Sequence, residues 1–114
     1  LGRAELRVGN DVSAKKHIID ALKLAVKSRD LGVILVALAA YAEMLAQQGK
    51  YESAVLLASL VYHHVLTWHE TRKQAADLLK LLKRSIPGKR FTSAEKRGRA
   101  ADIWKLAEDL IRQR

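Results

Sequence analysis

The residues best suited to chemistry in this sequence are three histidines and a glutamate within eight positions: His63, His64, His69 and Glu70. Imidazole nitrogens and carboxylate oxygens are common zinc ligands, so the group raises the question of a metal site. Its spacing argues against one. Neighbouring residues on a helix point about 100° apart, so His63 and His64 cannot share a face. We expect an adventitious or structural role for these side chains and no bound metal.

No other arrangement of residues resembles an active site. The chain has no Cys, and no nucleophile is paired with a His in the sequence pattern. A Gly-rich phosphate loop and a convergent pair of carboxylates are also missing from the sequence. We therefore expect a protein that is not an enzyme, with no catalytic residues and no cofactor.

Positive charge is the second notable feature, with 21 Lys and Arg against 12 Asp and Glu. Residues 80–99 contain one acid, Glu95, beside Lys80 and a basic patch that we define as Lys83, Arg84, Lys89, Arg90, Lys96, Arg97 and Arg99. This density could neutralise phosphates, which makes nucleic acid a candidate partner. Since Phe91 is the lone aromatic residue among these charges, no stacking platform for bases is present. A solvated face or a contact within a larger protein is favoured.

The elements that must position these residues are helices. Gly, Asn, Asp and Pro residues divide the chain into segments with helical periodicity, which predicts an all-α fold of six helices in about three hairpins. The predicted ranges are about 1–8, 11–28, 31–48, 51–65, 68–85 and 93–112. Asp30 suits an N-cap, and the spacing of Thr67 with Glu70 and of Thr92 with Glu95 is typical of capping boxes.

Composition sets the broad class. Apolar residues make up 49% and charged residues 29% of 114 positions, a balance typical of one soluble domain, here residues 1–114. The longest apolar run, Val33 to Ala42, is ten residues and too short to span a bilayer. We expect no membrane contact and, because Cys is absent, a cytoplasmic location. The chain opens on Leu1 without Met and is expected to be part of a longer protein.

A pattern of small and large apolar residues recurs forty positions apart in two of the predicted helix pairs. The first set is Leu1, Gly2, Gly9, Ala14, Ile18 and Ala21, and the second is Tyr41, Ala42, Gly49, Ala54, Ala58 and Val61. Small side chains let paired helices approach closely. The pattern resembles the tetratricopeptide repeat, which implies an α-solenoid fragment and a binding scaffold. The alternative is an ordinary helical bundle.

The second half shows a narrower resemblance. Its residues are Leu60-Val61-Tyr62-His63-His64, Thr67, Glu70-Thr71-Arg72, Leu78-Leu79, Ile86-Pro87, Arg97-Gly98-Arg99-Ala100 and Ala107-Glu108-Asp109-Leu110. This stretch is similar to the closing repeats of bacterial STAND-type ATPase regulators. The resemblance implies a sensor arm of a larger signalling or transcription-regulating protein. No P-loop is present, so ATPase chemistry is not assigned to this chain.

The repeat family binds its partners in a groove lined by the first helix of each pair. Counting from the small positions, the resemblance implies that the groove residues are Arg3 and Arg7, then Glu43 and Gln47, and in the third pair Asp77 and Lys80. The partner is expected to be a protein, a peptide, a small effector, the remaining domains of the parent chain or a second copy. Trp68 and Trp104 are interpreted as packing residues at the core or at helix edges.

The spacing of the histidines generates a first prediction. Purified protein should hold no stoichiometric zinc, and a chelator should leave its melting temperature unchanged, because no set of ligands shares a helix face. Metal analysis and thermal melts with and without chelator test this. One tightly held metal per chain that is lost in His64→Ala would contradict it.

Overall fold

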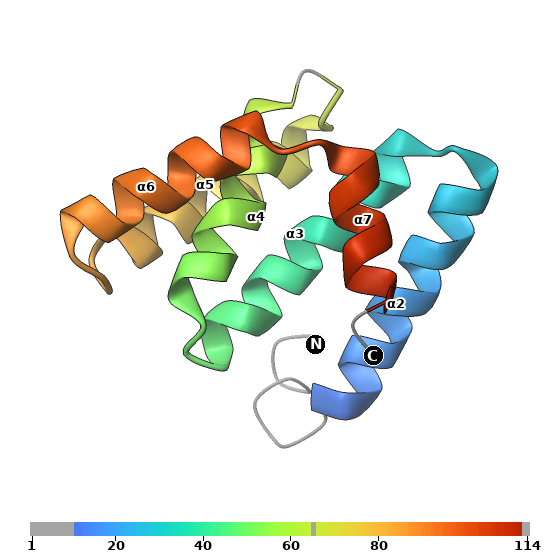
Figure 1. Ribbon diagram of the computed structural model, residues 1–114, viewed down its shortest axis with the longest axis horizontal. Helices are drawn as coiled ribbons and strands as arrows, with labels where there is room; N and C mark the ends of the chain where they lie inside the picture. The colour runs from blue at the N-terminus through green and yellow to red at the C-terminus, as the bar shows by residue number, and fades with distance from the viewer. Residues whose placement is uncertain (1–10, 65, 113–114) are drawn as a thin grey trace.

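The computed structural model describes residues 11–64 and 66–112 (Figure 1). Over these residues the chain is helical without a strand, which confirms the all-α fold class. The helices are α2 (Asp11–Ser28), α3 (Leu31–Gln47), α4 (Tyr51–His63), α5 (His69–Lys83), α6 (Gly88–Ala100) and α7 (Ile103–Arg112). The predicted helix 1–8 and the predicted groove residues Arg3 and Arg7 lie outside the described residues.

The turns that end α2 and α3 follow one pattern. Arg29 after α2 and Gly49 after α3 take left-handed backbone angles, with φ of 60° and 82°. The next amide in each turn, of Asp30 and of Lys50, donates to a carbonyl in the last turn of the helix before it, at 2.9 Å in both cases. This is the Schellman arrangement, and it reverses the chain within a few residues. The Asp30 carboxylate then accepts from the Val33 amide at 3.2 Å, which confirms the predicted N-cap of α3.

The first predicted capping box is wrong. The Thr67 hydroxyl does not cap α5 but donates to the carbonyl oxygen of Val61 at 2.6 Å, and Trp68 occupies the N-cap without a side-chain hydrogen bond. The Arg72 guanidinium similarly donates to the carbonyl oxygen of His64 at 2.8 Å. The last carbonyls of a helix lack partners within it. The Thr67 hydroxyl therefore bonds to a carbonyl at the end of α4 and not to an amide at the start of α5.

The predicted helix 93–112 is also wrong, because it is two helices. α6 begins at Gly88, directly after Pro87, so Thr92 lies inside a helix and caps nothing. Ala101 is extended, with ψ of 144°, and Asp102 starts α7 by accepting from the amides of Trp104 at 2.9 Å and of Lys105. A short carboxylate can stabilise a new helix start in place of a continuing helix, and here it does.

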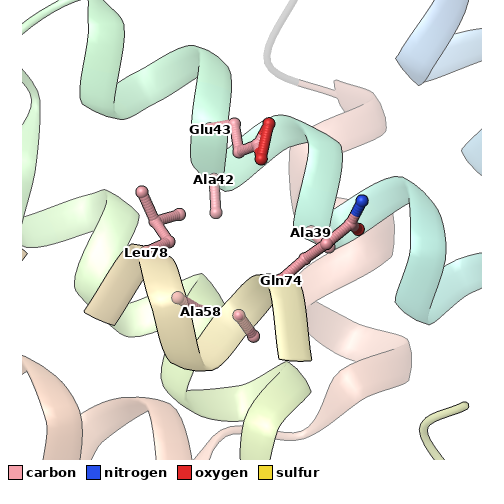
Figure 2. A pocket seen from close by; sticks show the side chains of 7 residues that line it. Ala39, Ala42, Glu43, Ala58, Gln74 and Leu78 are labelled. Carbon is pink, nitrogen blue, oxygen red and sulfur yellow. The ribbon is translucent and has the colours of Figure 1, made fainter. Parts of the chain in front are cut away.

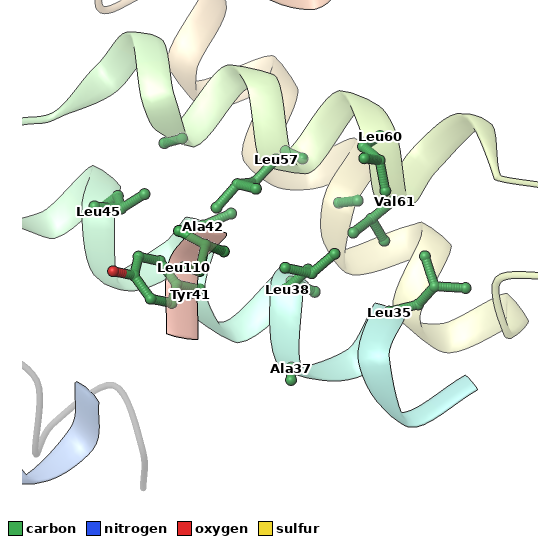
Figure 3. Close-up of a cluster of buried hydrophobic side chains, with 14 of the residues drawn as sticks. Leu35, Ala37, Leu38, Tyr41, Ala42, Leu45, Leu57, Leu60, Val61 and Leu110 are labelled. Carbon is green, nitrogen blue, oxygen red and sulfur yellow. The ribbon is translucent and has the colours of Figure 1, made fainter. Parts of the chain in front are cut away.

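α4 is the central helix and packs against α3, α5 and α6, while α2 packs on α3 (Figure 1). In Figure 3 the apolar side chains of α3 face those of α4, and Leu110 of α7 joins the same cluster. Ala42, Ala54 and Ala58, which belong to the predicted repeat, are each fully buried. Their small size allows neighbouring helices to approach closely.

The contact between α4 and α6 is unusually close. A Cβ added at Gly98 would overlap the carbonyl oxygen of Leu56 in α4. The buried Ser59 hydroxyl crosses the same contact and donates to the carbonyl oxygen of Glu95 at 3.0 Å. Ala94 lies one turn before Gly98 and is fully buried. Small residues therefore let α6 lie almost directly on the main chain of α4.

α7 returns to pack on α2, so the first and last described helices touch (Figure 1). At the edge of this contact the Arg29 guanidinium lies 5.0 Å from the ring centroid of Trp104, a cation–π distance. An open stack of hairpins would keep these helices apart, and the solenoid arrangement is not confirmed by the structure.

The α4–α6 contact generates a second prediction. Gly98→Ala should force the two helices apart and destabilise the protein by about 1 to 3 kcal/mol, the usual cost of overpacking a core. Gly88→Ala is the matched control, because nothing lies within 4 Å of a Cβ at Gly88. Chemical denaturation of both variants measures the difference. Equal stabilities would contradict the close contact.

Candidate functional site

The predicted groove residue Glu43 lies beside a shallow depression between α3 and α5. The depression is lined by side chains from three helices: Ala39, Ala42, Glu43, Ala58, Gln74, Ala75 and Leu78 (Figure 2). Its floor consists of alanines, because small residues are what allow α3 and α5 to lie next to each other. The polar groups at its margin come from Glu43 on α3 and Gln74 on α5.

The depression is too small to be a pocket for a ligand. It has no room for a water molecule. Sites for small molecules in proteins are usually concave, with volumes of about 300 Å³ or more. A partner would therefore lie across this face instead of entering it.

Gln47, Asp77 and Lys80, the other predicted groove residues in the described part of the chain, are exposed but do not line the depression. Gln47 is exposed one turn beyond Glu43 on α3. Asp77 lies two residues from both Ala75 and Leu79, which are buried, so it points to the opposite side of α5. Lys80 is also exposed and away from the buried stripe. In the third pair, the positions that face α3 are those of Gln74 and Leu78.

Two exposed apolar residues beside the depression were not found by sequence reasoning. Val36 is 39% exposed and Leu81 is 59% exposed. Val36 precedes Glu43 by seven residues and Leu81 follows Gln74 by seven, so each lies on the same helix face as that polar neighbour. We call Val36, Glu43, Gln74, Leu78 and Leu81 the α3–α5 face. The hydropathy pattern gave no signal for it, because Val36 stands on a nearly all-apolar helix and Leu81 stands among other leucines, and such residues are interpreted as core.

Trp68 borders this face at the start of α5. Its ring lies against Gly32 of α3, where an added Cβ would meet the ring at 2.7 Å. Trp68 is nevertheless 57% exposed, so the interpretation as helix-edge packing is only part of its role. Trp104 on α7 is half-buried and packs against the core. An exposed indole beside exposed aliphatic residues is typical of a surface that meets another protein.

The basic patch is divided by the structure. Lys83 and Arg84 end α5, while Lys89, Arg90, Lys96, Arg97 and Arg99 belong to α6. Arg90 is occupied, since its Nε donates to the Glu52 carboxylate of α4 at 2.8 Å. This hydrogen bond lowers the pKa of Glu52 and raises that of Arg90. The pair lies at an open cleft of about 380 Å³ between the starts of α4 and α6.

The histidines occupy unremarkable positions at the end of α4. The His64 Nδ1 accepts from the Leu66 amide at 3.1 Å, and the His63 ring meets the Tyr62 ring edge-on with centroids 4.9 Å apart. Within residues 11–64 and 66–112, no group of three or more His, Cys, Asp or Glu side chains is placed to hold a metal ion.

Comparison of the chain with protein-family models, with curated proteins and with solved structures finds no match. The resemblance to tetratricopeptide repeats therefore rests on this sequence alone. None of the helices in the described part of the chain combines the length and apolar character needed to cross a bilayer.

The Glu52–Arg90 pair generates a third prediction. Because the folded-state pKa of Glu52 is lowered, its contribution to stability is present above the ordinary Glu pKa of about 4.3 and is lost as the pH falls through the lowered value. The melting temperature of the wild type should therefore be slightly higher than that of Glu52→Gln at neutral pH. This difference should disappear in acid. Both side chains are substantially exposed, so the gap should be small and salt-sensitive.

Arg90→Gln is the companion variant for this test. Arg90→Gln should remove the same pH-dependent difference in melting temperature from the wild type. The double variant should have the same melting temperature as either single variant. A gap that is unchanged at low pH, or additive effects of the two substitutions, would contradict the coupling.

Proposed function

We propose that this chain is a non-catalytic protein-interaction module, and that a protein or peptide partner binds across the α3–α5 face. The observation that carries the proposal is the exposure of Val36 and Leu81, each of which shares a helix face with one of the polar residues, Glu43 and Gln74, that edge the depression. Apolar anchors next to hydrogen-bonding groups are the usual composition of a protein interface.

The shape of the face favours a macromolecular partner over a small effector. The depression offers no enclosed volume, so a small molecule would leave most of its surface in water there. An extended peptide or a partner helix could instead place apolar side chains against Val36, Leu78 and Leu81 and polar groups against Glu43 and Gln74. Trp68 would add apolar area at one end of the face.

The wider setting of the proposal is a cytoplasmic sensor arm in a larger bacterial signalling regulator. Support comes from the order of packing, in which α3, α4 and α5 each contact the next and α3 also contacts α5. Stacked helical hairpins would produce these contacts, and their concave side would bear the first helix of each pair. The contact of α7 with α2 is not part of such a stack of hairpins.

Site-specific photo-cross-linking provides the fourth prediction. A photoreactive phenylalanine analogue is placed at Val36, at Leu81 or at the control position Leu24 on α2, which is 68% exposed. In cells of the source organism, the first two positions should label the same protein and Leu24 should not, because only the α3–α5 face contacts the partner. Glu43→Lys should weaken both cross-links.

The cross-linking results distinguish between the possible roles of the α3–α5 face. Labelling of one protein from all three positions would mean that the face is not specific. Absence of labelling from Val36 and Leu81 would count against the proposal. Cross-links to another copy of the chain from these two positions would assign the face to self-association.

A further inference from the structure

The outer face of α6 is polar and positively charged. α6 rests on α4 through Phe91, Ala94 and Gly98, which are buried. The opposite side of the helix is turned to solvent and bears Lys89, Lys96 and Arg99, together with Thr92 and Ser93. We call these five residues the α6 outer face. Each can donate hydrogen bonds and none carries negative charge.

Most of the excess charge of the protein lies in and around this face. Residues 80–99 hold eight basic residues and one acid, whereas the remaining positions are nearly balanced, with thirteen basic and eleven acidic residues. Lys89, Lys96 and Arg99 form no ion pair among the described residues, in contrast to Arg90. The acid of the segment, Glu95, is partly buried and its backbone oxygen accepts from Ser59 in the contact with α4.

The charge in the first turn of α6 is placed against the stability of the helix, whereas Arg97 and Arg99 in its last turn are not. The first turn contains Lys89 and Arg90 and no acidic residue. The N-terminal end of a helix carries a partial positive charge, so cations there are unfavourable. Arg90 is compensated by Glu52, but Lys89 has no such partner among the described residues. A residue that opposes a local stability rule without compensation points to a use outside the fold.

We propose that the α6 outer face binds the sugar–phosphate backbone of nucleic acid without sequence selectivity. Lys89 and Arg99 are ten residues apart, or about 15 Å along the helix axis. Measured along the axis of a duplex, this length corresponds to about four phosphates of one strand. The hydroxyls of Thr92 and Ser93 lie between the charges and supply further donors to phosphate oxygens.

Composition favours nucleic acid over other anionic partners. The face contains no large exposed apolar side chain, which a protein interface would need at its centre. A helix that enters a membrane surface needs a free apolar side, and the apolar side of α6 is packed on α4. A polar, strongly basic surface is what interfaces with nucleic acid have in common.

The test measures binding of the whole chain to a labelled 20-base-pair duplex of arbitrary sequence over a range of salt concentrations. Lys89→Gln, Lys96→Gln and Arg99→Gln are combined in one variant. The matched control combines Lys16→Gln, Lys23→Gln and Lys27→Gln, which removes three charges from exposed positions on α2. Melting curves establish that both variants fold, and Lys96→Gln alone serves if the α6 triple variant does not.

The two variants should differ although their net charges are equal. The α6 variant should bind the duplex at least about tenfold more weakly, and the plot of log affinity against log salt should flatten by about 3, because three phosphate contacts are lost. For Lys96→Gln alone the slope should flatten by about 1. The α2 variant should lose less than about threefold in affinity and keep the wild-type slope.

Three results would overturn the proposal. One is an equal loss of affinity in the two triple variants, which would mean that binding depends only on net charge. Another is displacement of the duplex by polyglutamate at the same concentration of charge, which would indicate an acidic protein segment. The third is stronger binding to vesicles of anionic lipid than to the duplex. Substitutions on the α3–α5 face should leave duplex binding unchanged, so the two interactions are tested separately.

Discussion

The contact of Gly98 with the main chain of α4 is the constraint on which the rest of the structure depends. Helices usually pack with their axes about 8–10 Å apart, at a distance set by the side chains between them. At Gly98 there is no side chain, and the Leu56 carbonyl fills its place. α6 is thereby held flat on α4, with Phe91 and Ala94 buried and its basic residues directed outward. The position of α6 also determines where the turn at Ala101 and Asp102 can send α7.

Two exposed surfaces of different chemistry result from this packing. α4 is buried between them, because it contacts α3 and α5 as well as α6. The α3–α5 face combines exposed aliphatic residues with uncharged and acidic groups, and it suits a protein partner. The α6 outer face is basic and lacks apolar residues, and it suits a polyanion. The two proposed interactions would thus use separate surfaces of the described chain.

Much of the fold could be predicted from the sequence, because helix periodicity and turn residues act locally. The helix 11–28 has the predicted ends, and the Asp30 cap was predicted from its position alone. The failures involve competition between local and distant partners. The Thr67 hydroxyl could satisfy either of two helices, and it was the unsatisfied carbonyls of α4 that bound it. The predicted helix 93–112 missed the break at Asp102, whose carboxylate accepts from the first amides of α7.

The candidate site was predictable only in part. The spacing of the repeat selected Glu43, which lines the depression and lies within a helix whose register was clear. In the third pair the same counting selected Asp77 and Lys80, which point away from α3. The error arose because that pair lacks the forty-residue match that set the register in the other pairs. The exposure of Val36 and Leu81 depends on which helices cover them. A single sequence does not contain that information.

The return of α7 to α2 affects how the domain folds. Most contacts in this chain join helices that are close in sequence, and such contacts form quickly. The closure of α7 on α2 spans nearly the whole described chain, so it carries the largest loop entropy and would come late in folding. α7 is held through one face, by residues such as Ile103, Ala107 and Leu110. Its release would uncover only the part of α2 that it covers, because α2 remains packed on α3, and we expect α7 to open locally before the rest of the described chain.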